Sequence, residues 1–120
     1  MAMPKDQLQA MRSLQENWDG YGAAAPQARA LDLAHEFVDV LEAMLNSAAA
    51  DASRLHVSPT RVGGILIEWE YPATQHEIDI NPDRSITFLH LNKKTGQIDT
   101  RKFSSDSTAL LHELRLLLAA

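Results

Sequence analysis

Residues 65–80 read ILIEWEYPATQHEIDI, and this stretch decides the fold. Apolar and polar side chains alternate before and after residues 72–75, which is the pattern of two half-buried strands joined by a turn. A turn centred on residues 73–74 places Trp69 opposite Ile78, and the apolar faces of the two strands then agree. The stretch therefore predicts an antiparallel hairpin with one buried face and one polar face.

The same alternation continues downstream of the hairpin. Turn signals at residues 81–84 and 93–96 bound an alternating segment at 86–91, and residues 97–103 are expected to form an edge strand. Residues 104–107 are serines and an aspartate, which are good helix N-caps. They precede a helical stripe of leucines, at Leu110, Leu111, Leu114, Leu117 and Leu118. We expect further strands of a meander here, followed by a C-terminal helix.

Upstream of the hairpin the apolar period is helical. An amphipathic helix is expected at about residues 5–16, and a second, more deeply buried helix is expected to begin at Pro26. A short apolar stretch at residues 55–57 and a glycine turn at 63–64 lead into the hairpin. Helices and strands thus fall in separate runs, which is typical of the α+β class. We expect one α+β domain over residues 1–120: two N-terminal helices, an antiparallel meander of four to five strands and a C-terminal helix, with the helices packed on the sheet.

The composition is that of a globular protein, with 45% hydrophobic and 22% charged residues. The absence of cysteine excludes disulfides, thiolate metal sites and cysteine nucleophiles, and it fits a reducing compartment. No apolar run reaches the length of about 20 residues that a membrane span needs and no secretory signal is evident, so we expect a cytoplasmic protein without membrane contact. The net charge of −5 disfavours direct binding to nucleic acid and suits a partner protein with a basic surface.

The polar face of the hairpin carries carboxylates on both strands. The expected register places Glu70 opposite Glu77, and it also places Glu68 opposite Asp79. Like charges directly opposed across a sheet are destabilising. Two interpretations follow: a solvated face softened by basic residues of the last strand, or an acidic patch that docks onto a basic partner. A divalent cation is a third, but a flat sheet lacks the enclosing loop of calcium sites, so we expect no metal ion.

Two histidines support an enzyme as an alternative. If the turn at residues 82–84 sets the simplest register, His76 and His90 become neighbours on the inner face of the sheet. Together with nearby carboxylates they would suit a small metal-dependent or hydrolytic enzyme. No third ligand is evident at helical or strand spacing, and no nucleophile or phosphate-binding motif is present. We therefore expect a non-enzymatic protein with no catalytic residues and no cofactor.

A self-associating structural module is a further alternative. Leu66, Leu89 and Leu91 fall on the nominally outer face of the sheet, which is otherwise polar. An apolar patch at that place is suited to the interface of a homodimer.

The most distinctive feature of the chain is the loop Asn17-Trp18-Asp19-Gly20-Tyr21-Gly22. Trp18 continues the apolar face of the first helix. Tyr21 is expected to hold the two N-terminal helices together while its hydroxyl bonds a backbone group. The alternative is a hot spot for a binding partner, because tyrosine and tryptophan are enriched at such sites.

Residues 18–26 read WDGYGAAAP, which resembles a family of short bacterial and phage-associated proteins of uncharacterised function. Their motif W-D-G-Y-G-A-x-x-P follows a first helix. The similarity extends to the glycine turn, the strand that ends in Glu68-Trp69 and the acidic strand 76–80, so it covers roughly residues 8–90. The resemblance implies a fold but brings no catalytic or binding residues. By analogy, small accessory proteins of this kind suggest antitoxins, immunity proteins or inhibitors of defence nucleases.

Together these observations predict a protein-binding module that neutralises or modulates another protein. Its partner is expected to present a basic surface, and the acidic sheet face is expected to receive it. The expected contact residues are Glu68, Glu70, Glu77, Asp79, Trp18 and Tyr21.

Overall fold

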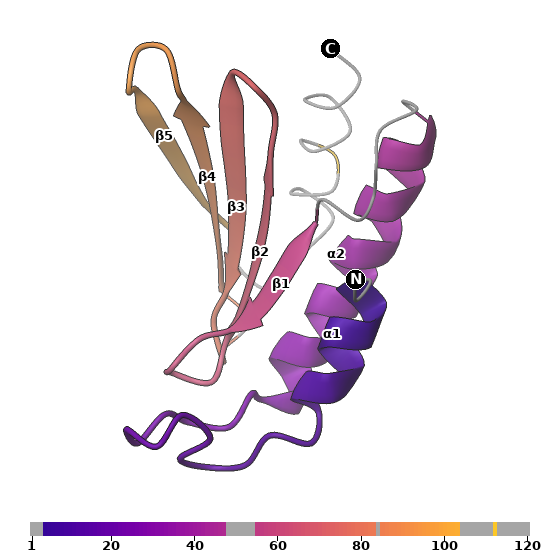
Figure 1. Ribbon diagram of the computed structural model, residues 1–120, viewed down its shortest axis with the longest axis vertical. Helices are drawn as coiled ribbons and strands as arrows, with labels where there is room; N and C mark the ends of the chain where they lie inside the picture. Colours follow the sequence, from indigo (N-terminus) through magenta and orange to yellow (C-terminus); the bar gives the residue numbers. More distant parts are fainter. Residues whose placement is uncertain (1–3, 48–54, 84, 104–111, 113–120) are drawn as a thin grey trace.

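The computed structural model describes residues 4–47, 55–83, 85–103 and 112, and it has two helices followed by a five-stranded antiparallel sheet (Figure 1). The helices are α1 (Pro4–Met11) and α2 (Ala28–Ser47). The strands are β1 (His56–Pro59), β2 (Ile65–Glu70), β3 (Thr74–Ile80), β4 (Ile86–Asn92) and β5 (Ile98–Phe103). The predicted α+β class, the two N-terminal helices and the meander are confirmed. Of the helix expected after residue 107, all residues except 112 lie outside the described residues.

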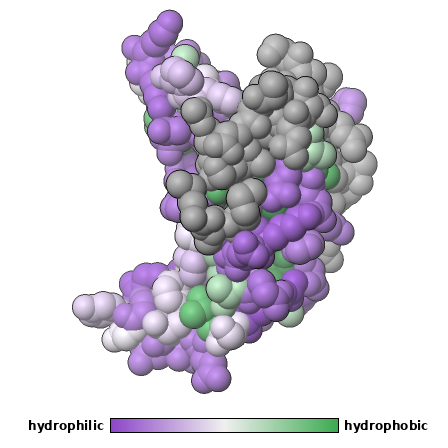
Figure 2. Space-filling model, turned by 45° about the vertical axis from the view of Figure 1, so that its right-hand side comes forward, coloured by the Kyte–Doolittle hydropathy of each residue, from purple (hydrophilic) through white to green (hydrophobic). Residues whose placement is uncertain are grey.

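Each strand of the sheet pairs with the strand that precedes it in the chain, in the order β1-β2-β3-β4-β5. Both described helices lie on one side of this sheet (Figure 1), where α1 contacts β1 and α2 contacts β2 and β3. We call the sheet face toward the helices the inner face and the opposite face the outer face. On the side drawn in Figure 2, the described residues present mainly hydrophilic surface with small apolar areas. Neither α1 nor α2 combines the length and the apolar character needed to cross a bilayer.

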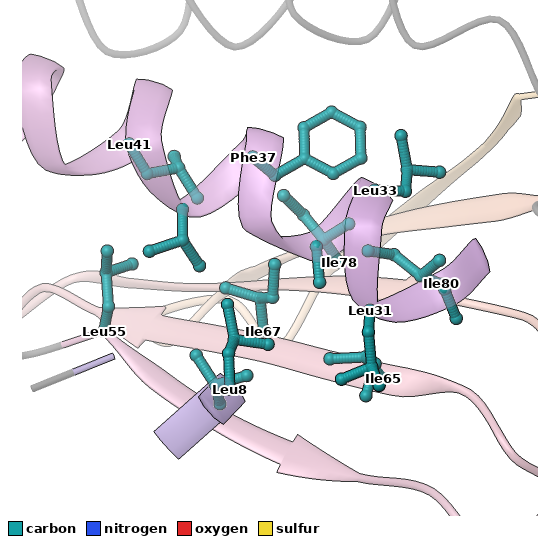
Figure 3. Packing of buried hydrophobic residues seen from close by; sticks show 14 of the residues in the cluster. Leu8, Leu31, Leu33, Phe37, Leu41, Leu55, Ile65, Ile67, Ile78 and Ile80 are labelled. Carbon is teal, nitrogen blue, oxygen red and sulfur yellow. The ribbon is translucent and has the colours of Figure 1, made fainter. Parts of the chain in front are cut away.

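The core forms where the apolar stripe of α2 meets the inner face of the sheet. Phe37 and Leu41 of α2 are both 0% exposed and belong to the same buried cluster as isoleucines of β2 and β3 (Figure 3). The strands alternate between buried and partly exposed residues, so every second side chain enters the core. Leu8 of α1 closes the cluster beside β1. Burial of this apolar area is the main force that holds the helices on the sheet.

The hairpin between β2 and β3 has a different register from the predicted one. Its turn is Pro72–Ala73, closed by a hydrogen bond of 2.8 Å from the backbone N–H of Tyr71 to the carbonyl of Thr74. Trp69 therefore pairs with His76 instead of the isoleucine expected. Proline has the fixed φ of a first turn position and no N–H for a strand pair, so it belongs inside the turn. Because the register moved by two residues, every side chain stays on its predicted face.

Both helices are shorter than predicted at the ends that face the loop between them. α1 ends at Met11 instead of continuing to residue 16, and the following N–H groups bond three residues back as far as Leu14. α2 begins at Ala28, two residues after Pro26. The N–H of Gln27, just before α2, donates to the carbonyl of Gly63 at 2.9 Å. The intervening loop is thus fastened to the turn before β2.

Candidate functional site

The outer face carries a ladder of three carboxylates on β2 and β3. Glu68 lies directly opposite Glu77, and Asp79 lies two residues further along β3, opposite Leu66. We call these three residues the acidic ladder. The predicted pairs of Glu70 with Glu77 and of Glu68 with Asp79 are wrong, because both depended on the hairpin register. The prediction that these carboxylates share one face is confirmed.

Glu70 differs from the acidic ladder because it has a cation of its own. It lies opposite Gln75, and its carboxylate is 3.0 Å from Nζ of Lys93 in the β4–β5 turn. A shallow depression beside it is lined by His56, Glu68, Glu70 and Gln75 and by Trp69. The charge of Glu70, at the edge of the acidic face, is therefore partly neutralised by Lys93.

The electrostatics of the acidic ladder are unfavourable in the isolated protein. Burial raises the pKa of Glu77, and the nearby charges of Glu68 and Asp79 raise it further, against a hydrogen bond of 3.3 Å from Gln75. Burial also raises the pKa of Asp79. The ion pairs of Lys5, Arg12, Arg61 and Lys93 go to other carboxylates than these three. The ladder is therefore a surface whose repulsion a positively charged partner would relieve.

Glu77→Gln is expected to raise the melting temperature by about 1–4 °C at pH 7, because a like-charge cross-strand pair is worth about 0.2–1 kcal/mol. A raised folded-state pKa means that protonation of Glu77 stabilises the folded protein below the ordinary pKa. This stabilisation is lost as the pH rises through the folded-state value. The advantage of the glutamine should therefore shrink toward pH 4. Thermal unfolding followed by circular dichroism measures the melting temperature at each pH. The control is Glu36→Gln at an exposed position of α2. An unchanged or lowered melting temperature of Glu77→Gln at pH 7 would contradict the prediction.

Beside the acidic ladder, the outer face becomes apolar on β4 and β5. Leu89 lies opposite Glu77, and Leu91 lies opposite Gln75 on one side and Ile98 on the other. Ile98 is 57% exposed, while the two leucines are partly exposed. We call Leu89, Leu91 and Ile98 the apolar stripe. The prediction that Leu66, Leu89 and Leu91 lie on the outer face is confirmed; self-association through them stays a prediction.

The two histidines proposed for an enzyme are neighbours, as predicted. His76 and His90 lie opposite each other on β3 and β4, with ring centroids 4.7 Å apart. His76 is buried and stacked on Trp69 at 5.1 Å, and Phe88 stacks on it at 6.1 Å. Burial lowers the pKa of His76 to about 4, with a further contribution from the charge of His90. At neutral pH His76 is therefore an uncharged member of an aromatic cluster.

This cluster leaves two buried polar atoms without a hydrogen-bond partner, Nε1 of Trp69 and Nδ1 of His76. Nε2 of His76 lies 3.3 Å from the hydroxyl of Thr74. Within residues 4–47, 55–83, 85–103 and 112, no group of three histidine, aspartate or glutamate side chains could hold a metal ion. The stacking of His76 between Trp69 and Phe88 gives its ring a packing role.

The loop between the helices is built by its own side chains. Oδ1 of Asp19 accepts hydrogen bonds from the backbone N–H of Tyr21 at 2.8 Å and of Ala23 at 3.1 Å, and the Arg61 side chain donates to Oδ2 at 3.0 Å. The Tyr21 hydrogen bond is the main cause of a lowered pKa at Asp19. Asn17 adopts a φ of 65°, which asparagine tolerates better than most residues, and accepts a hydrogen bond from Gly22. We call residues 17–25 the tip loop.

The two aromatic residues of the tip loop have different roles. Trp18 is partly buried, and its indole N–H donates to the carbonyl of Ala24 at 2.9 Å, which makes it structural. Tyr21 is 82% exposed. The prediction that it holds the helices together is therefore wrong. The ion pair of Asp19 with Arg61 and the bridge between Ala24 and Val62 fasten the loop to the turn between β1 and β2, while the Tyr21 ring stays exposed.

Arg61 is the residue of this region that the sequence did not identify. It donates to Asp19 and to the carbonyl of Tyr21, although 42 and 40 positions separate these partners from it in the chain. In the sequence, the only signal near Arg61 is the glycine turn at residues 63–64, which predicts a turn but no contact. Local patterns do not indicate which loops meet in space, so this contact had no signal that would have found it.

Comparisons with models of known protein families, with curated proteins and with solved structures found no significant match to the chain. The resemblance of residues 18–26 to a family of short bacterial and phage-associated proteins stays a prediction.

Proposed function

We propose that this protein is a non-enzymatic protein-binding module that modulates or neutralises another protein through the acidic ladder. An antitoxin, an immunity protein and an inhibitor of a defence system are examples of this type. The observation that carries the proposal is the direct opposition of Glu68 and Glu77 on an outer face that the described helices leave uncovered (Figure 1). Like charges at such positions reduce stability. A binding role would explain why glutamates stand at both positions despite this cost.

A basic partner gains from this arrangement in two ways. Lysine or arginine side chains placed between Glu68 and Glu77 remove their mutual repulsion, so binding is stronger than for an isolated carboxylate. The acidic surface also steers a basic partner during encounter and accelerates association at low ionic strength. Glu70 adds less, because Lys93 already holds its carboxylate. The proposed contact residues are therefore Glu68, Glu77 and Asp79.

The double variant Glu68→Lys/Glu77→Lys is expected to weaken partner binding by about 30-fold or more, because losing close interfacial charge pairs costs about 2–5 kcal/mol. The partner is first captured from the source cells with the tagged protein and then purified. Its dissociation constant is measured by calorimetry at several salt concentrations. Circular dichroism verifies that the variant is folded.

The matched control is Asp6→Lys/Glu36→Lys, which changes the net charge equally at exposed positions of α1 and α2. It should retain binding within about threefold. Equal losses in both double variants would assign the effect to net charge alone. Unchanged binding in Glu68→Lys/Glu77→Lys would remove the acidic ladder from the interface.

The tip loop is a second candidate contact surface. Its support is the 82% exposure of Tyr21 on a loop that hydrogen bonds hold in one conformation. A rigid exposed tyrosine contributes contact area at little entropic cost. Tyr21→Ala in the same titration separates the two surfaces. The enzyme alternative based on His76 and His90 has less support, because these rings pack against other aromatic rings.

A further inference from the structure

The outer face has two unlike halves that lie side by side, although Leu66 of β2 lies opposite Asp79 within the acidic half. The acidic ladder occupies β2 and β3, and the apolar stripe occupies β4 and β5. They meet where Glu77 of β3 lies opposite Leu89 of β4. A partner that fits this face must therefore present apolar side chains flanked on one side by positive charge. Both described helices lie on the inner face and leave this surface uncovered (Figure 1).

The spacing of these groups matches that of a helix. Residues two apart on a strand are separated by about 6.7 Å, and this is the step from Glu77 to Asp79 and from Leu89 to Leu91. Residues four apart on a helix rise by about 6 Å on one face. Across the sheet, the four strands β2 to β5 span about 14 Å, which is close to a helix diameter of about 10–12 Å. One helix would thus reach both halves at once.

The backbone of the partner also favours a helix. A sheet face offers side chains, whereas the free backbone groups of a sheet lie at its edges. An extended segment laid across the outer face would bury N–H and C=O groups without partners. A helix satisfies these groups internally and presents only side chains.

We propose that the binding element of the partner is a basic amphipathic helix that lies along β4. Its apolar side chains contact the apolar stripe, and lysine or arginine residues on one flank contact Glu77 and Glu68. This inference rests on the proposed function, because it specifies the partner of the same surface.

The probe is a fluorescein-labelled synthetic peptide of about 18 residues, with leucines at the i, i+3, i+4 and i+7 positions and lysines on one flank. A scrambled peptide of identical composition is the control ligand. Fluorescence anisotropy with the full-length protein at about 0.15 M ionic strength gives both dissociation constants. The amphipathic peptide should bind at least about 10-fold more tightly than the scramble and gain helicity on binding.

Two sets of variants assign the contacts. Leu91→Asn/Ile98→Thr and Glu68→Gln/Glu77→Gln should each weaken peptide binding by about 10-fold, because each removes one half of the surface. Asp6→Asn/Glu36→Gln on the helices changes the net charge as the second pair does and should leave binding within about twofold. Melting temperatures verify that all variants are folded.

Other outcomes overturn the helix and separate it from the proposed function. Equal binding of both peptides, or no effect of Leu91→Asn/Ile98→Thr on peptide binding, would overturn the helix. The proposed function would still hold if Glu68→Lys/Glu77→Lys weakened binding of the native partner. If Glu68→Lys/Glu77→Lys still bound both the peptide and the native partner as tightly as the unchanged protein, the helix and the proposed function would both be overturned. A homodimer that Leu91→Asn/Ile98→Thr dissociates, seen by light scattering, would assign the apolar stripe to a second copy and overturn the helix.

Discussion

Replacement of Phe37 with alanine is expected to lower the free energy of unfolding by about 3–5 kcal/mol. The Phe37 side chain, in the middle of α2, is 0% exposed and belongs to the buried cluster that α2 forms with the strands (Figure 3). Its removal loses the transfer energy of the ring and leaves a cavity that a two-layer core closes only in part. A domain of this size has a total stability of about 5–15 kcal/mol, so this one truncation removes a large share of it.

Urea denaturation followed by tryptophan fluorescence measures this loss. Phe37→Leu is the matched control, since it keeps an apolar side chain and should lose less than half as much stability. A loss below about 1 kcal/mol for Phe37→Ala would mean that the ring does not occupy the core. Partner binding by the folded fraction should be retained, because the outer face lies on the other side of the sheet.

Gly64→Ala is expected to lower stability by about 1–3 kcal/mol, for a steric reason. A Cβ at this position would collide with the carbonyl oxygen of Ile80 and lie 3.1 Å from the hydroxyl of Thr60. The Ile80 carbonyl cannot turn away freely, because Ile80 pairs with Ile65 at the start of β2. The strand start must shift, and the pairing of β2 with β3 weakens.

Thermal and urea unfolding of Gly64→Ala measure the effect. Gly96→Asn is the control: Gly96 has a φ of +75°, which asparagine tolerates, and nothing lies within 4 Å of an added Cβ. The control should lose much less stability than Gly64→Ala. Equal losses would show that backbone conformation matters more than the contact with Ile80.

The faces of the sheet were predictable from the sequence, whereas the register was not. Alternation determines which side chains share a face, and turns centred at residues 72–73 or 73–74 satisfy it equally. Proline chemistry at Pro72 decides between them. The members of the acidic ladder were therefore predicted, but their pairs were not. The ion pair of Glu70 with Lys93 depends on how two separate turns approach, which no local pattern describes.

The tip loop shows the opposite case, in which local patterns pointed to the wrong structure. Leu14 and Trp18 continue the helical spacing of α1, so the helix was predicted to reach residue 16. Asn17 and Asp19 instead use their side chains to bond nearby backbone N–H groups, which competes with helix formation. The position of Tyr21 then depends on Arg61, a contact between distant segments.

The meander has a consequence for the newborn chain. Each strand pairs with its predecessor, so the order of synthesis is also the order in which the sheet can assemble. At a translation rate of about 5–20 residues per second, roughly 2–7 s pass between completion of α2 and the emergence of Ile80 at the end of β3. During this interval the buried face of α2 lacks the complete β2–β3 surface that covers it in the folded protein. The nascent chain is then most exposed to aggregation, and a translational pause between residues 47 and 80 would prolong that risk.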